Sequence, residues 1–126
     1  MQARIFGGLL LLWLAAGLGA AEAETPLQEP AQPGRFFRLQ LGRGVELAFV
    51  WIAPMQLWVG ETEISNAQFR RYDASHSSSN LLGRDLDHDL QPVVQVSWEE
   101  AHNYCGWLNR RYGAWLPAKT VFRLPP

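Results

Sequence analysis

Hydrophobic and polar residues are arranged in a pattern that predicts three β-strands between residues 36 and 64. Phe37, Leu39 and Leu41 are each followed by a polar residue or a glycine, which is the period of two of a strand with one buried face. A continuous apolar run over residues 47–52 predicts a second, more buried strand. After a break at a proline and a methionine, residues 57–64 predict the third.

A fourth strand is predicted by three valines, Val93, Val94 and Val96, which follow Pro92. β-Branched residues favour extended backbone, and proline suits the first position or the edge of a strand. The spacing of the hydrophobic residues changes at Ser97, so we expect this strand to lead directly into a helix.

That helix begins with a capping box and is the longest element that the sequence predicts. Ser97 is followed three residues later by Glu100, so each side chain can accept a hydrogen bond from the other residue's backbone amide. Apolar side chains then recur at steps of three and four, which places them on one face. These residues are Trp98, Ala101, Cys105, Leu108 and Tyr112. We expect the helix to stop at Gly113.

A second, shorter helix is predicted by another capping box, formed by Ser65 and Gln68. It should continue to about Tyr72, with Phe69 and Tyr72 facing inward because they lie three residues apart. The two arginines between them are expected to face solvent. Mixed strands with two helices in a chain of 126 residues predict a single domain of the α+β class.

The N-terminal residues predict export. Residues 1–4 carry one positive charge, and residues 5–18 form an apolar run that is shorter than a bilayer-spanning helix. Small residues follow, and Ala21-Glu22-Ala23 offers a cleavage site after Ala23, although Gly19-Ala20-Ala21 would also serve.

We therefore expect residues 1–23 to be a signal peptide, with a periplasmic or extracellular mature protein that keeps no membrane anchor. An uncleaved anchor is the alternative interpretation. Residues 24–35 are rich in Pro, Glu, Gln and Ala without an apolar period, which is typical of a linker. Residues 36–126 would then form the domain.

Composition and charge narrow the range of partners. The formal net charge is −1 and the chain has no basic cluster, so we expect neither nucleic acid nor an anionic membrane as a partner. Six Trp and six Phe are many for a chain of this size, and we expect them to supply much of the core. An aromatic platform for carbohydrate is the alternative.

A long polar loop is predicted over residues 75–91, and loops of this length are usually functional or mobile. Asp85, Asp87 and Asp89 alternate within it, a spacing that also occurs in calcium-binding loops. The glycine and the bidentate acid of such loops are missing, however, which favours a solvated acidic surface.

The spacing of the histidine and cysteine residues is not typical of a metal-binding or a catalytic site. His76, His88 and His102 are not at the spacing of zinc ligands, and the chain has a single Cys. We therefore assign no catalytic, cofactor-binding or metal residue and expect no cofactor for this chain. Cys105 is expected to be a small buried hydrophobe. A free reactive thiol and an intermolecular disulfide are the alternatives.

Three segments resemble the formylglycine-generating enzyme family, the sulfatase-modifying factors. Residues 96–108 contain V-S-W, an acidic residue, an alanine and then Y-C-x-W-L. Residues 63–69 resemble the family's E-V-T-N-x-x-F/Y segment, and residues 122–125 resemble the start of its R-L-P-T-E-A-E-W signature. The order and spacing of the three segments also match those of the family.

This resemblance implies the family's α+β fold, which is related to that of C-type lectins. Complete members are implied to be copper-dependent oxidases that convert a sulfatase cysteine to formylglycine. Their copper-binding cysteines lie in the C-terminal half, and Cys105 does not match them. The R-L-P-T-E-A-E-W signature lies near the middle of the family's domain, and Pro126 stands where the signature has Thr. We therefore expect residues 36–126 to be a truncated, N-terminal part of such a domain.

Two functional hypotheses follow from these expectations. The first is an exported protein with a sulfatase-modifying-factor-like domain that is catalytically incomplete as given. Such a domain would bind a protein partner or a second chain that completes it. The alternative is a non-catalytic protein- or glycan-binding module. A truncated gene product without a settled function is the third interpretation.

Overall fold

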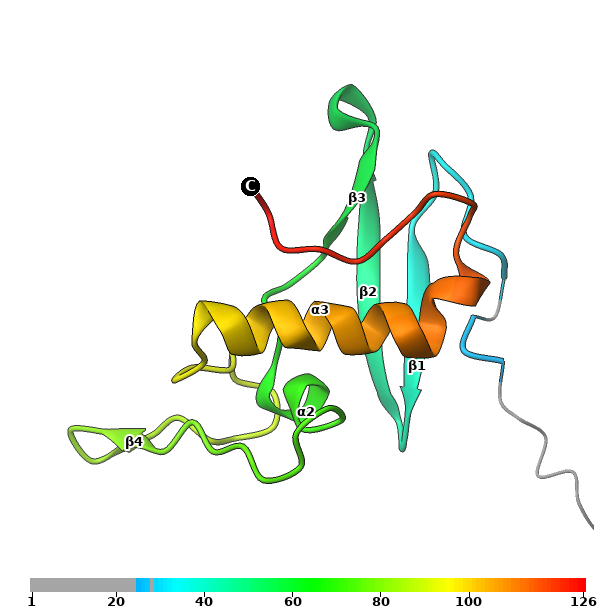
Figure 1. Cartoon of the computed structure of the whole chain (residues 1–126). Coiled ribbons are helices and arrows are strands. Elements are labelled where there is room, and N and C mark those ends of the chain that lie inside the picture. Colours follow the sequence, from blue (N-terminus) through cyan, green and yellow to red (C-terminus); the bar gives the residue numbers. More distant parts are fainter. Residues whose placement is uncertain (1–24, 28) are drawn as a thin grey trace, which may run out of the picture.

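The computed structural model describes residues 25–27 and 29–126 (Figure 1). The predicted signal peptide lies outside these residues. The elements follow one another as β1 (Phe37–Gly42), β2 (Val45–Ile52), η1 (Ala53–Met55), β3 (Leu57–Gly60), α2 (Asn66–Phe69), β4 (Asn80–Leu81), β5 (Arg84–Asp85), α3 (Trp98–Tyr112) and η2 (Gly113–Trp115). This arrangement confirms the α+β class and the presence of both predicted helices, although α2 ends at Phe69 and not at about Tyr72.

Three antiparallel strands form the main sheet in the order β1-β2-β3. Phe37 pairs with Phe49, and Trp51 pairs with Trp58, so one face of the sheet is lined by aromatic rings. The alternation predicted for residues 37–41 is confirmed, because every second side chain there is buried.

The third strand ends at Gly60 and not at residue 64. Ile64 pairs elsewhere, since its carbonyl accepts a hydrogen bond of 2.8 Å from the Val93 amide. Ser65 likewise forms an isolated bridge with Pro92. The chain has therefore left the sheet before it enters α2.

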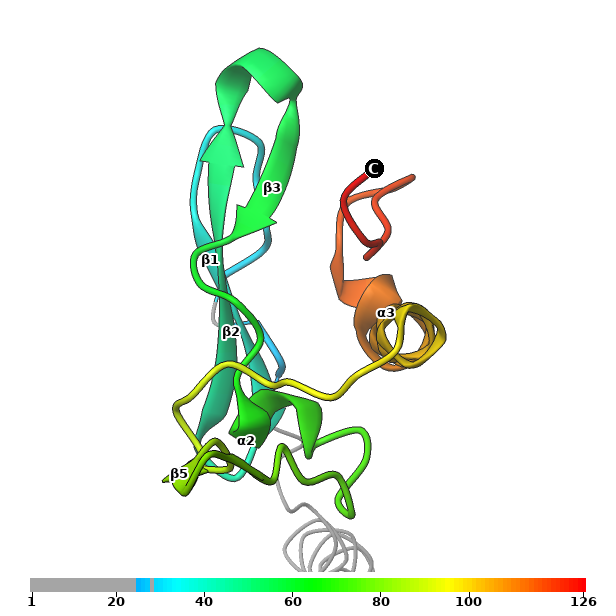
Figure 2. The ribbon, with the colours of Figure 1, turned by 90° about the vertical axis from the view of Figure 1, so that its left-hand side faces the viewer.

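Helix α3 crosses β1 and β2, while β3 lies beyond it at one end of the sheet (Figure 1). Viewed from the side, the helix and the sheet form separate layers (Figure 2). The core lies between these layers and continues onto α2. Its buried hydrophobic residues are Leu27, Ala31, Phe37, Leu39, Leu41, Leu47, Phe69, Tyr104, Leu108, Tyr112 and Leu116. Of the Trp and Phe residues expected to supply much of the core, Phe37 and Phe69 are buried, while Phe49, Trp58, Trp107 and Phe122 are partly buried against it. The prediction therefore holds only in part, and two tyrosines that it did not name, Tyr104 and Tyr112, are also buried.

Both capping boxes are confirmed. In α3 the Ser97 hydroxyl accepts from the Glu100 amide at 3.1 Å, and the Glu100 carboxylate accepts from the Ser97 amide at 2.7 Å. Ser65 and Gln68 make the same reciprocal pair at the start of α2. Both helix starts are therefore fixed by residues three apart in the sequence.

The expected apolar face of α3 is wrong at its first residue. Trp98 is 71% exposed, and its ring stacks on His102 with centroids 5.1 Å apart. Tyr104, which the pattern omitted, is buried with Leu108 and Tyr112. The face that packs on the sheet is thus set by the second half of the helix, and the first turn extends beyond the core.

Gly113 does not stop the helix in a left-handed conformation. Its φ of −58° is right-handed, and the chain continues as the 3₁₀ turn η2. The Leu116 amide then donates to the Gly113 carbonyl at 3.2 Å. Because Leu116 is buried at the end of this turn, the tighter geometry brings one more apolar side chain into the core.

The strand predicted for the three valines does not form. Only Pro92 makes a bridge, and Gln95 adopts a left-handed φ of 57° that interrupts the extended backbone. The Val94 amide donates to the Ser78 hydroxyl at 3.0 Å and not to another strand. The segment is held in place by the polar loop and has no neighbouring strand to pair with in the described part.

Residues 25–35 do not behave as the predicted linker. Leu27 and Ala31 are buried, and Leu27 bridges to Leu39. The Gln40 amide also donates to the Pro26 carbonyl at 2.7 Å. The segment therefore packs along β1 through three buried residues, Pro26, Leu27 and Ala31. Composition could not indicate this, because the other described residues of the segment are exposed.

The C-terminal segment, residues 117–126, runs back across the sheet from the end of η2 (Figure 1). Asn109 on α3 holds it, since its amide group both donates to the Phe122 carbonyl at 2.9 Å and accepts from the Phe122 amide at 2.7 Å. The Phe122 ring then packs on Phe49, with centroids 5.8 Å apart. In the described residues, no helix is both long enough and apolar enough to cross a membrane.

Candidate functional site

The polar loop between α2 and α3 is held in place by one buried side chain at the start of α2. Asn66 has no exposed surface. Its Nδ2 donates to the carbonyls of Leu86 at 2.8 Å and His88 at 2.9 Å, and its Oδ1 accepts from the Ser78 hydroxyl at 2.5 Å. Asn66 thus connects both sides of the loop to α2.

Ser78 is the second fully buried polar residue of this network. Its hydroxyl accepts from the Val94 amide at 3.0 Å, and its own amide donates to the Asp87 carboxylate at 2.7 Å. Buried polar groups are stable only when they are hydrogen-bonded, and every group of this kind in the described residues has a partner. The loop is therefore fixed in one conformation.

The acidic string of the loop is largely used within the protein. Arg70 donates through Nη1 to Asp87 at 3.0 Å and through Nη2 to Asp89 at 2.7 Å. The Asp85 carboxylate accepts from the Asp87 amide at 2.9 Å. The prediction that Arg70 faces solvent is thus wrong. The acidic string itself is exposed at Asp85 and Asp89, as expected for an acidic surface, while Asp87 is partly buried.

Electrostatics around Asp87 agree with this geometry. The hydrogen bond from the Ser78 amide is the main reason that the pKa of Asp87 is below its usual value, and the nearby Arg70 guanidinium lowers it further. The Asp89 carboxylate in turn raises the pKa of Arg70. The carboxylate and the guanidinium therefore stabilise each other in their charged forms.

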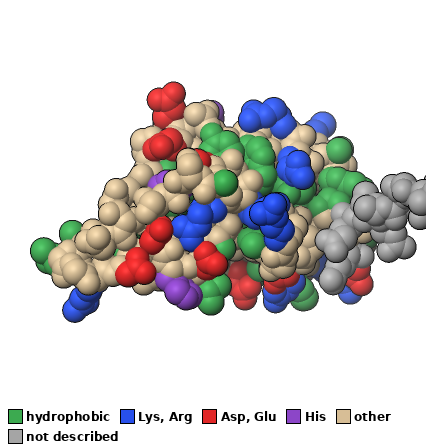
Figure 3. Space-filling model, turned by 90° about the horizontal axis from the view of Figure 1, so that it is seen from below, with side chains coloured by type: hydrophobic (Ala, Val, Ile, Leu, Met, Phe, Trp, Pro, Cys, Tyr) green, Lys and Arg blue, Asp and Glu red, His purple; other side chains and the backbone are tan. Residues whose placement is uncertain are grey.

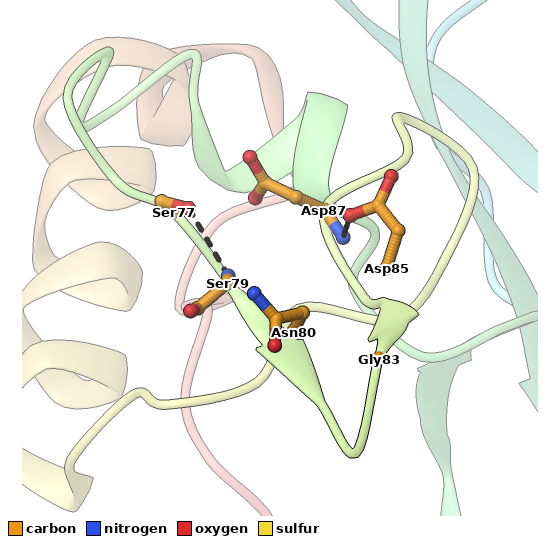
Figure 4. A pocket seen from close by; sticks show the side chains of 6 residues that line it. All are labelled: Ser77, Ser79, Asn80, Gly83, Asp85 and Asp87. Carbon is orange, nitrogen blue, oxygen red and sulfur yellow. Dashed lines mark hydrogen bonds between the residues drawn. The ribbon is translucent and has the colours of Figure 1, made fainter.

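An open hollow of ≈ 580 Å³ lies within this loop (Figure 4). Its walls come from the β4–β5 hairpin and from the irregular segments on either side of it. The lining residues are Ser77, Ser79, Asn80, Gly83, Asp85 and Asp87. Within the described part of the chain, no group of three or more His, Cys, Asp or Glu residues is placed to hold a metal ion. The calcium interpretation therefore has no ligand set here.

The three histidines lie apart and have separate roles. His76 packs on Phe69 with centroids 4.8 Å apart, and its Nε2 is 3.0 Å from the Val94 carbonyl. His88 accepts from a backbone amide through Nδ1 at 3.3 Å. His102 lies against the exposed Trp98 ring. They form no catalytic arrangement with one another.

Cys105 lies in the middle of α3 and is partly buried. Burial raises the pKa of its thiol, which lowers the fraction of reactive thiolate at neutral pH. Copper(I) favours soft thiolate ligands, and the family chemistry implied by the sequence resemblance takes two of them. A single partly buried thiol with a raised pKa does not fit such a site, so we assign no copper ligand in this chain.

Sequence reasoning did not single out Asn66 or Ser78 as a buried pair. Asn66 occupies the asparagine position of the segment that resembles E-V-T-N, and this match is the sequence feature that could have identified it. Ser78 lies in a run of three serines, and nothing in the sequence distinguishes it from its neighbours. Only the fold shows which of the three hydroxyl groups faces the core.

A three-stranded sheet crossed by a capped helix, with a polar loop tied to a buried asparagine, defines this chain as a small α+β scaffold. Residues 49–126 match the family model of the sulfatase-modifying factor enzyme 1-like domain (FGE-sulfatase). Because this match covers more than half of the 126 residues, the chain belongs to that family. Neither curated proteins nor solved structures gave a match.

Proposed function

We propose that this protein is an exported member of the sulfatase-modifying-factor family and that residues 1–126 do not generate formylglycine by themselves. The observation that carries the proposal is Cys105, which is the single cysteine of the sequence. It lies on a helix within the fold and its thiol has a raised pKa. Without the oxidation chemistry, we expect the chain to act as a scaffold that a partner or another chain completes.

The experiment is an oxidation assay with the purified chain. Copper(I), oxygen and a sulfatase-derived cysteine peptide are added, and the mass of the peptide is followed. We expect no more aldehyde than copper alone produces, and the same result for Cys105→Ala. Aldehyde formation above the copper control that disappears in Cys105→Ala would overturn the proposal and give this thiol a catalytic role.

Export is supported by the short apolar run and the small residues that end near residue 23. The expected product is a periplasmic or extracellular protein without a membrane anchor. N-terminal sequencing of the exported protein tests this directly. A chain that still begins before residue 18 would contradict cleavage and favour the uncleaved anchor.

A second candidate function is a non-catalytic protein- or glycan-binding module on a C-type-lectin-related fold. The supporting observation is the exposed pair of rings at the start of α3, where Trp98 is 71% exposed and stacks on His102. Flat exposed aromatic rings are suited to sugar rings and to apolar partner side chains.

Trp98→Ala separates the two candidates. If the chain is a binding module, this change should abolish its NMR saturation-transfer signals with oligosaccharides or its retention on a partner protein. Phe36→Ala, which alters another aromatic residue that is 71% exposed, is the matched control and should leave both unchanged. Equal loss in both variants would contradict a specific role for Trp98.

A further inference from the structure

A second hollow of the molecule lies away from the polar loop, where β1, the turn after α2 and the end of α3 meet. It is an open groove of ≈ 340 Å³. Its lining includes Arg71, Arg111, Tyr112 and Trp115 together with Pro26 and Gly42. We call it the two-arginine groove. Viewed from below, the molecule shows several basic side chains beside hydrophobic ones, with acidic side chains on the same face (Figure 3).

Arg71 is held against the groove wall through one end of its guanidinium. Its Nε donates to the Leu41 carbonyl at 2.9 Å. Its Nη2 lies against Gly42, where an added Cβ would be only 3.3 Å away. A guanidinium has five N–H donors, so this anchoring leaves its terminal donors for another partner. Arg71 therefore does not simply face solvent, as its place in the sequence had suggested.

Arg111 is held in a similar way on the opposite element. Its Nε donates to the Tyr112 hydroxyl at 3.2 Å, and its Cζ lies 5.7 Å from the centre of that ring. Tyr112 is buried, which gives the guanidinium a rigid support. Arg111 also keeps its terminal N–H donors for a further partner.

Neither arginine has a carboxylate partner among the described residues, where the ion pairs involve Arg38 and Arg70. The contrast with Arg70 is informative, because that neighbour of Arg71 has two acidic partners. No acidic residue of the described part of the chain lines the groove. Two fixed guanidinium groups in one concavity produce a positive potential that favours an anion.

The groove also has an aromatic wall. Trp115 is 47% exposed and lines the groove beside Tyr112 and Pro26. A flat apolar group can pack on this wall while an attached anionic group reaches the arginines. Such a combination of a few polar groups on an apolar surface is typical of small-molecule sites.

We propose that the two-arginine groove binds a small organic oxyanion, a carboxylate or phosphate carried on a flat apolar group. The guanidinium groups of Arg71 and Arg111 donate charge-assisted hydrogen bonds to the oxyanion, an interaction for which arginine is well suited. The indole of Trp115 contacts the apolar part. The proposal does not depend on the oxidation chemistry of the family or on the export of the protein.

The test is a calorimetric and ¹H–¹⁵N NMR titration of the purified full chain. The probes are phenyl phosphate, benzoate, inorganic phosphate and benzyl alcohol. We expect phenyl phosphate or benzoate to bind best, with shifts at the Trp115 indole N–H. Inorganic phosphate should bind more weakly and benzyl alcohol not measurably. The preferred aromatic anion shows whether the source of the oxyanion is a phosphate or a carboxylate.

Arg111→Gln should weaken binding of the preferred probe about tenfold or more, since it removes a charged hydrogen-bond donor. Arg110→Gln is the matched control, because it alters a neighbouring exposed arginine that does not line the groove. Trp115→Leu should weaken the aromatic anions but leave inorganic phosphate unchanged. Circular dichroism checks that each variant is folded.

Three results would overturn the proposal. The first is the absence of binding by both aromatic anions at millimolar concentration. The second is an equal loss of affinity in Arg110→Gln and Arg111→Gln, which would mean nonspecific attraction by surface charge. The third is equal binding of benzyl alcohol and benzoate, which would mean an apolar groove with no role for the arginines.

Discussion

The hydroxyl of Ser78 donates a hydrogen bond of 2.5 Å to Oδ1 of Asn66, and neither side chain has exposed surface. Twelve positions separate the two residues in the sequence. Through this contact the start of α2 and the polar loop become one unit. Because the loop also holds Val94, the same contact positions the segment that leads into α3.

The first prediction concerns this contact. Ser78→Ala leaves the Val94 amide and the Asn66 carbonyl oxygen without their partner, and unsatisfied buried groups cost about 1–3 kcal/mol each. Urea unfolding should show a lower midpoint. Ser79→Ala is the matched control, because that neighbouring residue is exposed, and its midpoint should be nearly unchanged. Equal effects in both variants would contradict a specific role for Ser78.

The second prediction concerns the start of α3. Ser97→Ala removes the side chain that accepts from the Glu100 amide, and loss of an N-cap costs about 1 kcal/mol of stability. Denaturant unfolding measures the change. Asn103→Ala, at an exposed position of the same helix, should not destabilise the protein because alanine favours helix. An unchanged midpoint and slope for Ser97→Ala would refute the capping role.

The third prediction concerns pH. The Ser78 amide and the Arg70 guanidinium lower the pKa of Asp87 in the folded protein from its usual value of 3.8. The stability that the ionised carboxylate contributes is therefore present above pH 3.8 and is lost as the pH falls through the lower folded value. Asp87→Asn keeps an acceptor for the Ser78 amide but removes the charge.

The measurement compares unfolding free energies of the parent protein and Asp87→Asn from about pH 7 down to about pH 2. We expect the parent to be more stable at neutral pH and the difference to shrink in acid. Glu99→Gln, at an exposed position in the first turn of α3, controls for the general effect of removing a negative charge. If the parent protein became more stable relative to Asp87→Asn as the pH fell, the sign would contradict a stabilising role for the ionised Asp87 carboxylate.

The fourth prediction concerns the Cys105 thiol. Burial raises its pKa, so the native protein contains less thiolate at neutral pH than the unfolded chain does. Alkylation of the native protein should be slow near neutral pH and should accelerate as the pH rises. The unfolded protein in urea should react much faster. Native labelling as fast as that of the unfolded chain would contradict the partial burial of the thiol.

Much of the local structure could be predicted from the sequence. The alternation from Phe37 to Leu41 placed three side chains of β1 in the core, and two serine-led capping boxes located the starts of α2 and α3. Each of these signals depends on residues that are close in the sequence. Backbone geometry relates such residues directly, so the tertiary structure had little freedom to alter the outcome.

Other predictions failed where the partner of a residue comes from a distant segment. Three valines favoured a strand, but Gln95 interrupts it and the Val94 amide is taken by Ser78. Trp98 had the correct spacing for the helix face but lies beyond the edge of the core. A strand needs a neighbour, and a helix face is buried only where another element covers it.

For the candidate sites, too, some properties follow from the sequence and others only from the tertiary structure. The sequence by itself determined the family, the α+β class and the number of thiols, because motifs, patterns and composition are properties of the chain alone. Only the tertiary structure decided that Arg70 has two acidic partners, while Arg71 and Arg111 line one groove to which the described residues contribute no acidic side chain. Arg70 and Arg71 are adjacent in the sequence. Their electrostatic surroundings differ because a distant segment places carboxylates beside Arg70 and none beside Arg71.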